Sequence, residues 1–568
     1  MYHFIPSWYE ENSWAARYVP WYRESDTATF DDTVNQIRLF REAGEETELV
    51  CLAYMPNLRR FLHRENIYPI PFWSAFDALQ GVTWEKPAVL SYEELPWPVG
   101  IEWVYQPAKV LAYLKRELYA AIEFEESGSL CWVEYYETRD GQSVLSRRDI
   151  YDDRGFRSSS AWYWGGRPRR QEYYSPKGDL CFYEDVTTGE ITRFVERPVK
   201  ARGESRIRTW GTDRLGREGG TCIETIRYRC MEDLIREAAK TFFRKRLDRE
   251  PYVIAANAQH NAMLLELLKE WADQDVVLSF FGDRYDLSDN EALLRDTAAA
   301  GLVVTDTENA ARRIREAGVP GEKIYDISPY DTRLSLGRSQ QIKELKVFMP
   351  LDGLEGIFRQ KALRQMFEYM KRNTNVSLQI GTRKEGGDEQ EALAEEMRAV
   401  LADCGVSDLQ IRISALHSED QEVGEEPEET AIAGKAATER IEIVPYHSEN
   451  DLTRILDDVR LIVDVRDQPD LYLQIAGISA GIPQVNYRLT RYVKHLKNGY
   501  IIENINFITG ALEYYLEGLA NWNEALVYCV QEGSRYTGGQ LVDQWRAKTE
   551  HRDAREELQK AEDWANAT

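Results

Sequence analysis

Residues 461–487 read LIVDVRDQPDLYLQIAGISAGIPQVNY, and their pattern predicts the fold of the chain. It begins with an apolar, β-branched run at Leu461–Val463, which predicts a buried strand. A turn at Gln468–Pro469 separates this strand from an apolar helical segment at Leu471–Ala480. Short elements of this kind, in the order strand, loop, helix, indicate one unit of an α/β sheet.

The end of the same stretch resembles the donor-site unit of GT-B glycosyltransferases. Gly481 suits a left-handed C-cap and Pro483 cannot continue a helix, so a strand is expected again at Gln484–Tyr487. In the family, two carboxylates eight positions apart hold the sugar nucleotide. When the family's Gly and Pro are laid on Gly481 and Pro483, those positions fall on Gln468 and Ala476. The resemblance implies that the chain retains the fold of the donor-site unit but lacks the two carboxylates that hold the sugar nucleotide.

The loop after the first strand of the second domain extends this comparison. Retaining GT-B enzymes place an Arg and a Lys there, which neutralise the nucleotide diphosphate. Here the loop reads PLDGLEG, and matching Leu351 and Gly356 to the family pattern puts Pro350 at the Arg position and Glu355 at the Lys position. A diphosphate depends on charge-assisted contacts, and an anion would repel it. The sequence therefore predicts no donor binding and no cofactor.

The loop alignment leaves one alternative open. A shift of one or two residues would place Asp464, Asp467 or Asp470 at a carboxylate position. At the other end of the protein, no glycine occurs before Gly44, so no phosphate cradle is expected after the first strand at Tyr2–Ile5.

The segment Gly477–Gly481 also matches G-x-S-x-G, the nucleophile elbow of serine hydrolases. That elbow needs a strand before the serine and a full helix after it. Pro483 follows Ser479 by four residues, and the next segment is predicted as a strand. Small side chains where a helix packs closely on a sheet explain the pattern better.

Composition sets the class of protein. The chain has 568 residues, of which 43% are hydrophobic and 29% charged, with a formal net charge of −25. This excludes a broad basic surface for nucleic acid or anionic membranes. Seven cysteines without a CxxC pair, and no run of eighteen apolar residues, favour a cytoplasmic protein without a metal site or a transmembrane segment.

The order of patterns along the chain predicts the domains. Alternating helices and strands flank a region of aromatic and β-branched alternation with regularly spaced Gly turns, which indicates an antiparallel meander inserted in an α/β fold. We expect two GT-B-like, Rossmann-like domains facing a cleft. The predicted divisions are an N-terminal Rossmann-like domain at 1–120 and 235–340, an inserted β domain at 121–234, a C-terminal Rossmann-like domain at 341–535, and a C-terminal helix at 536–568 that returns to the first domain.

One part of the inserted β domain is rich in aromatic residues. Its candidate surface consists of Trp162, Trp164, Tyr173, Tyr174 and Arg167. Because Trp, Tyr and Arg dominate binding hot spots, this surface could stack on a glycan or seat a partner protein. Ordinary cross-strand aromatic packing would produce the same pattern, and the sequence does not decide between the two.

A second unusual segment is acidic. Within residues 417–439, the eleven positions 419–429 carry seven acids and one proline. Such a composition predicts a solvated or disordered loop. Whether it becomes ordered on assembly is left open.

Several longer motifs resemble a specific family. Five motifs are similar to the first accessory secretory proteins of the accessory Sec system in streptococci, staphylococci and lactobacilli. In chain order they are WYRE, FDDTVNQIRLF, AYMPNLRRFLHRENIY, IYDDRGFRSS and DLYLQIAGISAGIPQVNY. The matches run from the N-terminus to about residue 490. The resemblance implies a complex with the other two accessory secretory proteins and the accessory SecA-type motor ATPase, which exports serine-rich repeat glycoproteins. It also implies a place in the cytoplasm or, through the complex, at the inner face of the membrane.

These observations favour a non-enzymatic transport component, a pseudo-glycosyltransferase that binds its substrate or partners through a degenerate scaffold. Two alternatives remain. The chain could be an active glycosyltransferase on Ser/Thr-rich repeats, which would need acids or cations that the alignment does not supply, or a chaperone subunit of such a transferase.

Overall fold

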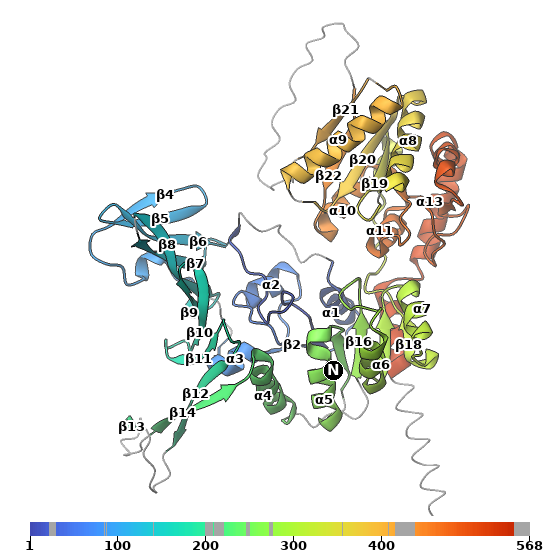
Figure 1. Ribbon diagram of the computed structural model, residues 1–568. Coiled ribbons are helices and arrows are strands. Elements are labelled where there is room, and N and C mark those ends of the chain that lie inside the picture. Colours follow the sequence, from blue (N-terminus) through green and yellow to red (C-terminus); the bar gives the residue numbers. More distant parts are fainter. Residues whose placement is uncertain are drawn as a thin grey trace, which may run out of the picture. The chain divides into compact units, whose positions relative to one another are not determined.

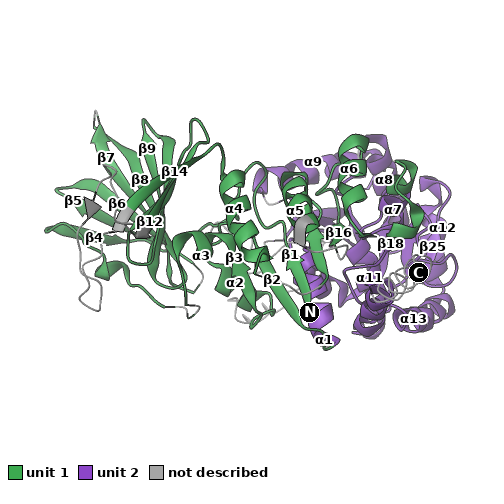
Figure 2. Ribbon diagram, turned by 90° about the horizontal axis from the view of Figure 1, so that it is seen from below, with its two compact units in different colours: residues 1–25, 44–304, 313–325 green, residues 26–43, 305–312, 326–568 purple. Residues whose placement is uncertain are grey.

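A computed structural model describes residues 1–549 apart from 22–29, 85, 87, 126, 140, 199–207, 210–220, 246–249, 272–275, 355, 385, 407 and 415–437. The chain forms two compact units (Figures 1 and 2). The first contains residues 1–25, 44–304 and 313–325, and the second contains 26–43, 305–312 and 326–568. Helix α1 at Asp32–Glu42 belongs to the second unit, although its place in the sequence predicts the first domain.

The first unit contains a seven-stranded sheet in the order β18-β17-β16-β15-β1-β2-β3. The strands are Tyr2–Ile5 (β1), Thr47–Cys51 (β2), Phe72–Ser74 (β3), Tyr252–Ala255 (β15), Val276–Phe280 (β16), Leu302–Thr305 (β17) and Ile324–Asp326 (β18). Its helices are Leu58–Arg64 (α2), Ala75–Gln80 (α3), Met231–Phe243 (α4), Ala258–Trp271 (α5) and Asn290–Ala299 (α6), while Glu308–Glu316 (α7) spans the division between the units. The central strands pair in parallel and are buried, as their apolar runs predict.

An eleven-stranded antiparallel sheet is inserted in the first unit, in the order β13-β14-β12-β11-β10-β9-β8-β7-β6-β5-β4 (Figure 1). Its strands are Ile101–Tyr105 (β4), Lys109–Leu114 (β5), Glu117–Phe124 (β6), Leu130–Arg139 (β7), Gln142–Asp152 (β8), Phe156–Trp164 (β9), Arg167–Tyr174 (β10), Leu180–Asp185 (β11), Ile191–Pro198 (β12), Arg208–Thr209 (β13) and Thr221–Tyr228 (β14). Glycines at several hairpin turns have positive φ, including Gly155, Gly165, Gly166 and Gly178. These angles agree with the turns that the sequence predicts.

This sheet begins at Ile101, twenty residues before the boundary at 121 that the sequence predicts. The hairpin between β5 and β6 turns at Lys115 and Arg116, whose φ angles are 52° and 68°. Positive φ is uncommon for residues other than glycine, so the turn carries no glycine signal in the sequence. The sequence pattern therefore does not include the first strands in the meander.

The second unit contains a parallel sheet of seven strands in the order β21-β22-β20-β19-β23-β24-β25. The strands are Leu345–Pro350 (β19), Val376–Thr382 (β20), Leu409–Ile413 (β21), Thr438–Pro445 (β22), Val459–Asp464 (β23), Gln484–Asn486 (β24) and Gly499–Ile501 (β25). The helices are Gly356–Arg372 (α8), Gly387–Asp403 (α9), Glu449–Leu456 (α10), Leu471–Ala480 (α11), Ile508–Leu512 (α12) and Leu519–Gly533 (α13), together with α1. Side chains alternate along β19, where Val347 and Met349 enter one apolar cluster and Phe348 enters another, so both faces of the sheet are covered.

The unit β23-α11-β24 is the stretch that predicts the fold, and the structure confirms it. Helix α11 ends at Gly481, whose φ is 73°. A Cβ on Gly477 would lie 2.6 Å from Nε2 of Gln484 and 2.8 Å from Cδ1 of Ile462, so only glycine lets the helix approach the sheet this closely. Ser479 lies in the helix, and its hydroxyl donates to the Ile475 carbonyl at 2.9 Å. The segment is a packing motif and not a nucleophile elbow.

Residues 538–549 form the last described helix. The ring of Trp545 lies 5.6 Å from that of Phe40 in α1, and Arg546 donates to the Ala43 carbonyl at 3.3 Å. The predicted return of the chain toward its beginning is thus a contact with α1, inside the second unit. Residues 550–568 and most of the acidic segment 417–439 lie outside the described residues.

Candidate functional site

The candidate site is the carboxyl edge of the parallel sheet in the second unit, where the sequence places the donor-site positions. Pro350 is buried at the end of β19, Gln468 is exposed in the loop after β23, and Ala476 is half-buried in α11 against an apolar cluster. The fourth position, Glu355, lies outside the described residues. None of the three described side chains can act as an acid, a base or a cation.

The first aspartate of this edge, Asp464, is fully buried and paired with Arg466. Nε of Arg466 lies 2.8 Å from Oδ1 of Asp464, and Nη2 lies 2.7 Å from Oδ2. The backbone N–H of Asp470 donates to the same carboxylate at 3.0 Å. Burial alone would lower the pKa of the Arg466 guanidinium, but the neighbouring Asp464 carboxylate outweighs burial and raises this pKa above its ordinary value.

Asp470 forms the second pair of this edge. Its Oδ1 accepts from the backbone N–H of Leu473 at 2.9 Å and so caps α11, while its Oδ2 accepts from Nη2 of Arg383 at 3.0 Å. The guanidinium carbon of Arg383 lies 4.5 Å from the ring centroid of Phe30. Asp352, in the loop after β19, accepts from the backbone N–H of Arg383 at 2.6 Å. Arg383 is therefore held by an acid, a ring and its own backbone.

Asp467, the third aspartate of this loop, pairs with Arg488 at the surface, with Nε of Arg488 2.7 Å from Oδ1. Each of the three aspartates that a shifted alignment would place at a carboxylate position thus has an arginine partner. Sequence reasoning did not find the arginines Arg383, Arg466 and Arg488. The spacing D-x-R at Asp464 is the one local signal of such a pair.

The chemistry open to this edge follows from the pairing. A nucleotide diphosphate needs guanidinium or ammonium groups that are free to turn toward it, and a transferred sugar needs a free carboxylate. Here Asp464 and Arg466 are buried against each other, whereas the pairs Asp467–Arg488 and Asp470–Arg383 lie nearer the surface. Among the residues that the structure describes, no group of three or more His, Cys, Asp or Glu side chains is placed to hold a metal ion.

In the first unit, a buried histidine lies just after the carboxyl end of β15. Nε2 of His260 donates to the Ala255 carbonyl at 2.8 Å, which leaves Nδ1 to accept from the hydroxyl of Tyr9 at 2.7 Å. Burial, together with the positive charge of the nearby Arg284, lowers the pKa of His260 to about 3. The imidazole is therefore neutral at physiological pH with both nitrogens occupied, which is typical of a structural histidine.

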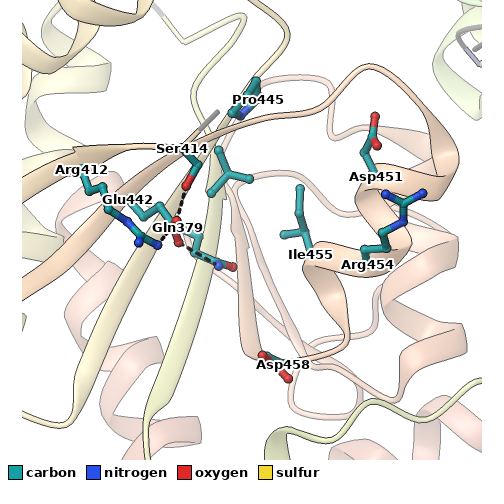
Figure 3. A pocket seen from close by; sticks show the side chains of 10 residues that line it. Gln379, Arg412, Ser414, Glu442, Pro445, Asp451, Arg454, Ile455 and Asp458 are labelled. Carbon is teal, nitrogen blue, oxygen red and sulfur yellow. Dashed lines mark hydrogen bonds and ion pairs between the residues drawn. The ribbon is translucent and has the colours of Figure 1, made fainter. Parts of the chain in front are cut away.

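A pocket of about 320 Å³ opens between β20, β21, β22 and α10 of the second unit (Figure 3). Glu442 accepts from Arg412 and Ser414 and, at 3.4 Å, from Gln379. Burial alone would raise the pKa of Glu442, but these hydrogen bonds, led by that from Ser414, hold it below its ordinary value. Helix α10 contributes Arg454 to the opposite wall. Pro350, Gln468 and Ala476 do not line this pocket.

The predicted aromatic surface is only partly exposed. Trp162, Trp164 and Arg167 are exposed, whereas Tyr173 and Tyr174 are 5% and 7% exposed. A change of register between Tyr173 and Tyr174 lets both neighbours be buried, which strict alternation along a strand would not predict. The two tyrosines are therefore removed from the candidate surface.

Two parallel α/β sheets with an antiparallel sheet inserted in the first unit are the elements of a GT-B-like fold. Together with a donor edge whose acids are paired with arginines, they define a glycosyltransferase-like protein. Residues 1–551 match the model of an accessory Sec system protein family, that of accessory secretory protein 1, and the chain belongs to that family. It is thus an accessory Sec system protein.

Individual relatives agree with this assignment. The accessory Sec system protein of the same family from Streptococcus gordonii is 34% identical over 549 residues, which cover 96% of this chain and 98% of the relative. A crystal structure of accessory secretory proteins 1, 2 and 3 in Streptococcus pneumoniae matches at 28% identity with a TM-score of 0.74, over 97% of this chain and 99% of the matched chain.

A more distant likeness concerns the fold alone. The pneumococcal O-GlcNAc transferase GtfA, solved in complex with UDP and GlcNAc, is 10% identical, with a TM-score of 0.58 over 97% of this chain and 98% of that chain. This supports the GT-B-like fold. Within the described ranges, no helix is both long and apolar enough to cross a membrane.

Proposed function

We propose that the chain is a non-enzymatic component of the accessory Sec export system, which helps deliver serine-rich repeat glycoproteins to the translocase. The observation that carries the proposal is the buried pair of Asp464 and Arg466, whose side chains are 0% and 12% exposed at the edge where a donor would bind. The chain keeps the scaffold of a glycosyltransferase, while the described donor-site positions Pro350, Gln468 and Ala476 carry no charge and the nearby Asp464 is paired with Arg466.

The free energy needed to break the pair of Asp464 and Arg466 supports the proposal that no sugar nucleotide binds at this edge. To free Asp464 or Arg466 for a ligand, a buried ion pair must be broken, which leaves an uncompensated charge at a cost of about 3–5 kcal/mol. Micromolar binding provides about 8 kcal/mol in total. A nucleotide sugar would therefore lose a large part of its binding free energy in opening the edge.

We propose partners from the same system. The pneumococcal structure contains accessory secretory proteins 1, 2 and 3 together, and for this chain we propose an assembly with the other two accessory proteins. The SecA-type motor ATPase and the glycoprotein substrate are further proposed partners, in the cytoplasm or at the inner face of the membrane. A net charge of −25 opposes direct attraction to anionic lipid, so membrane association is proposed to occur through the complex.

Calorimetry with the full-length chain tests the absence of donor binding. Titration with UDP-GlcNAc and UDP-glucose, with and without Mg²⁺, is expected to give no heat of binding. A Kd in the micromolar range for any of these titrations contradicts the proposal. Transfer of labelled sugar to a Ser/Thr-rich repeat peptide would establish an active glycosyltransferase in its place.

Co-purification from the native organism tests the transport role. The tagged chain is expected to retain the other two accessory proteins and the motor ATPase. Retention of glycosyltransferase subunits without these proteins would favour the chaperone alternative. Hydrogen exchange on the purified assembly then locates the surfaces that become protected.

A further inference from the structure

One face of the inserted sheet carries an aromatic–arginine stripe, which we define as Tyr135, Arg147, Trp162, Arg170 and Tyr183. These residues come from five consecutive strands, β7 to β11 (Figure 1). Tyr135 is directly opposite Arg147, Arg147 is opposite Trp162, and Trp162 is opposite Arg170. The first four residues therefore lie in one row across the strands, and Tyr183, which is opposite Glu172, lies diagonally next to Arg170.

The side chains of the stripe contact one another. The guanidinium carbon of Arg147 lies 4.1 Å from the ring centroid of Tyr135 and 5.3 Å from that of Trp162. The guanidinium carbon of Arg170 lies 3.8 Å from the ring centroid of Tyr183. Such cation–π contacts fix the planes of the rings and of the guanidinium groups.

Glu172 links Trp162 of β9 to Arg170 of β10. Its Oε2 accepts from Nε1 of Trp162 at 2.7 Å, and its Oε1 lies 2.7 Å from Nη2 of Arg170. The hydroxyl of Tyr174 donates to the same carboxylate. The indole of Trp162 is thus held in one orientation while 37% of its surface remains exposed.

The charges of the stripe are balanced within the sheet. Arg147 lies 3.0 Å from Asp149, and Arg170 pairs with Glu172. Because each guanidinium already has a carboxylate partner, the stripe offers little attraction to a strongly charged partner. Of the five residues of the stripe, Trp162 is exposed and the other four are half-buried, with Tyr135 packed against Trp97 and Tyr119.

The same face extends to a second indole. Trp164 follows Trp162 by two residues, so the two side chains leave the strand on the same side. Trp164 is 67% exposed. On the opposite side of the sheet, Tyr173 packs with Phe76 and Phe182.

We propose that the stripe and Trp164 bind a neutral glycan. The C–H faces of a sugar ring can stack on the indoles, and its hydroxyl groups can bond with the planar groups of Glu172 and Arg170. These groups are already held by their neighbours, so little conformational entropy is lost on binding. The charge balance of the stripe favours a neutral ligand over a charged peptide segment, because both of its guanidinium groups already have carboxylate partners within the sheet. The inference deepens the proposed function, since the glycan would belong to the glycoprotein substrate.

The test uses the full-length chain and three probes observed by saturation-transfer NMR and calorimetry. The probes are a Ser/Thr-rich peptide, the same peptide carrying O-linked GlcNAc or glucose, and the free sugars. We expect binding of the glycosylated peptide and of at least one free sugar, without binding of the bare peptide. The variants Trp162→Ala and Trp164→Ala are each expected to raise the Kd about tenfold, whereas Trp164→Phe retains most of the affinity.

Trp84→Ala is the matched control, because Trp84 is also exposed, at 43%, but lies outside the stripe. It is expected to leave the Kd unchanged, and thermal unfolding shows whether each variant is folded. Equal binding of the bare and the glycosylated peptide would assign the face to polypeptide and overturn the proposal, as would no binding to any sugar probe. Neither outcome depends on the nucleotide-sugar titrations, so the two proposals can fail separately.

Discussion

Asp464 and Arg466 form a two-point ion pair at the carboxyl end of β23, with both guanidinium-to-carboxylate distances below 3 Å. Asp464 is fully buried, and its carboxylate also accepts from the Asp470 backbone, so the pair fixes the loop that leads into α11. A single side-chain pair therefore holds the loop in shape and withholds an acid and a cation from any ligand.

Arg466→Met is expected to destabilise the second unit by about 3–5 kcal/mol, because it leaves the buried Asp464 carboxylate without a counter-charge. Urea unfolding, followed by hydrogen exchange of the β23 amides, measures the loss. The double variant Asp464→Asn with Arg466→Met removes the uncompensated charge and should recover most of the stability. If the double variant is no more stable than Arg466→Met, loss of packing and not loss of the pair is the cause.

The sequence predicts the β23-α11-β24 unit well because its signals are local. Apolar β-branched residues define the strand, and Gly481 and Pro483 end the helix within a few residues of it. That Pro350, Gln468 and Ala476 carry neither an acid nor a cation is evident from the sequence, and their assignment as the donor-site positions stays a prediction.

The ion pairs of the candidate site could not be inferred in the same way. Arg383 lies 87 positions before Asp470, and only the parallel order of the strands brings the two together. Local propensity also failed at Lys115 and Arg116, which adopt a glycine-like conformation, and at Tyr173 and Tyr174, where a shift of register buries both. In each of these places tertiary packing outweighs the local pattern.

Gly477→Ala tests the close approach of α11 to the sheet. The added methyl group would meet the side chains of Gln484 and Ile462 at less than 3 Å, so the variant should lose about 1–3 kcal/mol of stability. Gly510→Ala in α12 is the matched control, since nothing lies within 4 Å of its added Cβ, and it should gain about 0.4–1 kcal/mol. Thermal unfolding of both variants measures the difference, and equal shifts in Tm would refute the packing argument.

The lowered pKa of His260 predicts that the free energy of unfolding depends on pH. Burial lowers its pKa from 6.5 to about 3 in the folded chain, so between these values the unfolded chain binds a proton that the folded chain does not. The contribution to stability is fully present above pH 6.5 and is lost as the pH falls toward 3, by about 1.4 kcal/mol per pH unit.

The variant His260→Gln should lack this component, so its unfolding free energy should change less between about pH 6.5 and 5 than that of the parent chain. Tyr9→Phe is the control, because it removes the hydrogen bond that Nδ1 of His260 accepts but leaves the imidazole buried. It should lower stability while keeping the slope. Parallel curves for His260→Gln and the parent chain would contradict the assignment of this proton to His260.

Asp470 combines a helix cap with an ion pair, and two substitutions separate these roles. Asp470→Asn keeps an acceptor for the Leu473 N–H and loses only the pair with Arg383, whose side chain is 47% exposed, so it should cost less than about 1 kcal/mol. Asp470→Ala loses both interactions and should cost about 1–2 kcal/mol. Urea unfolding of the two variants checks the division, with Arg383→Met as a measure of the pair together with the contact of Arg383 with the Phe30 ring. If the Asn and Ala variants are equally stable, the cap contributes nothing, and α11 is held in place by its packing against the sheet.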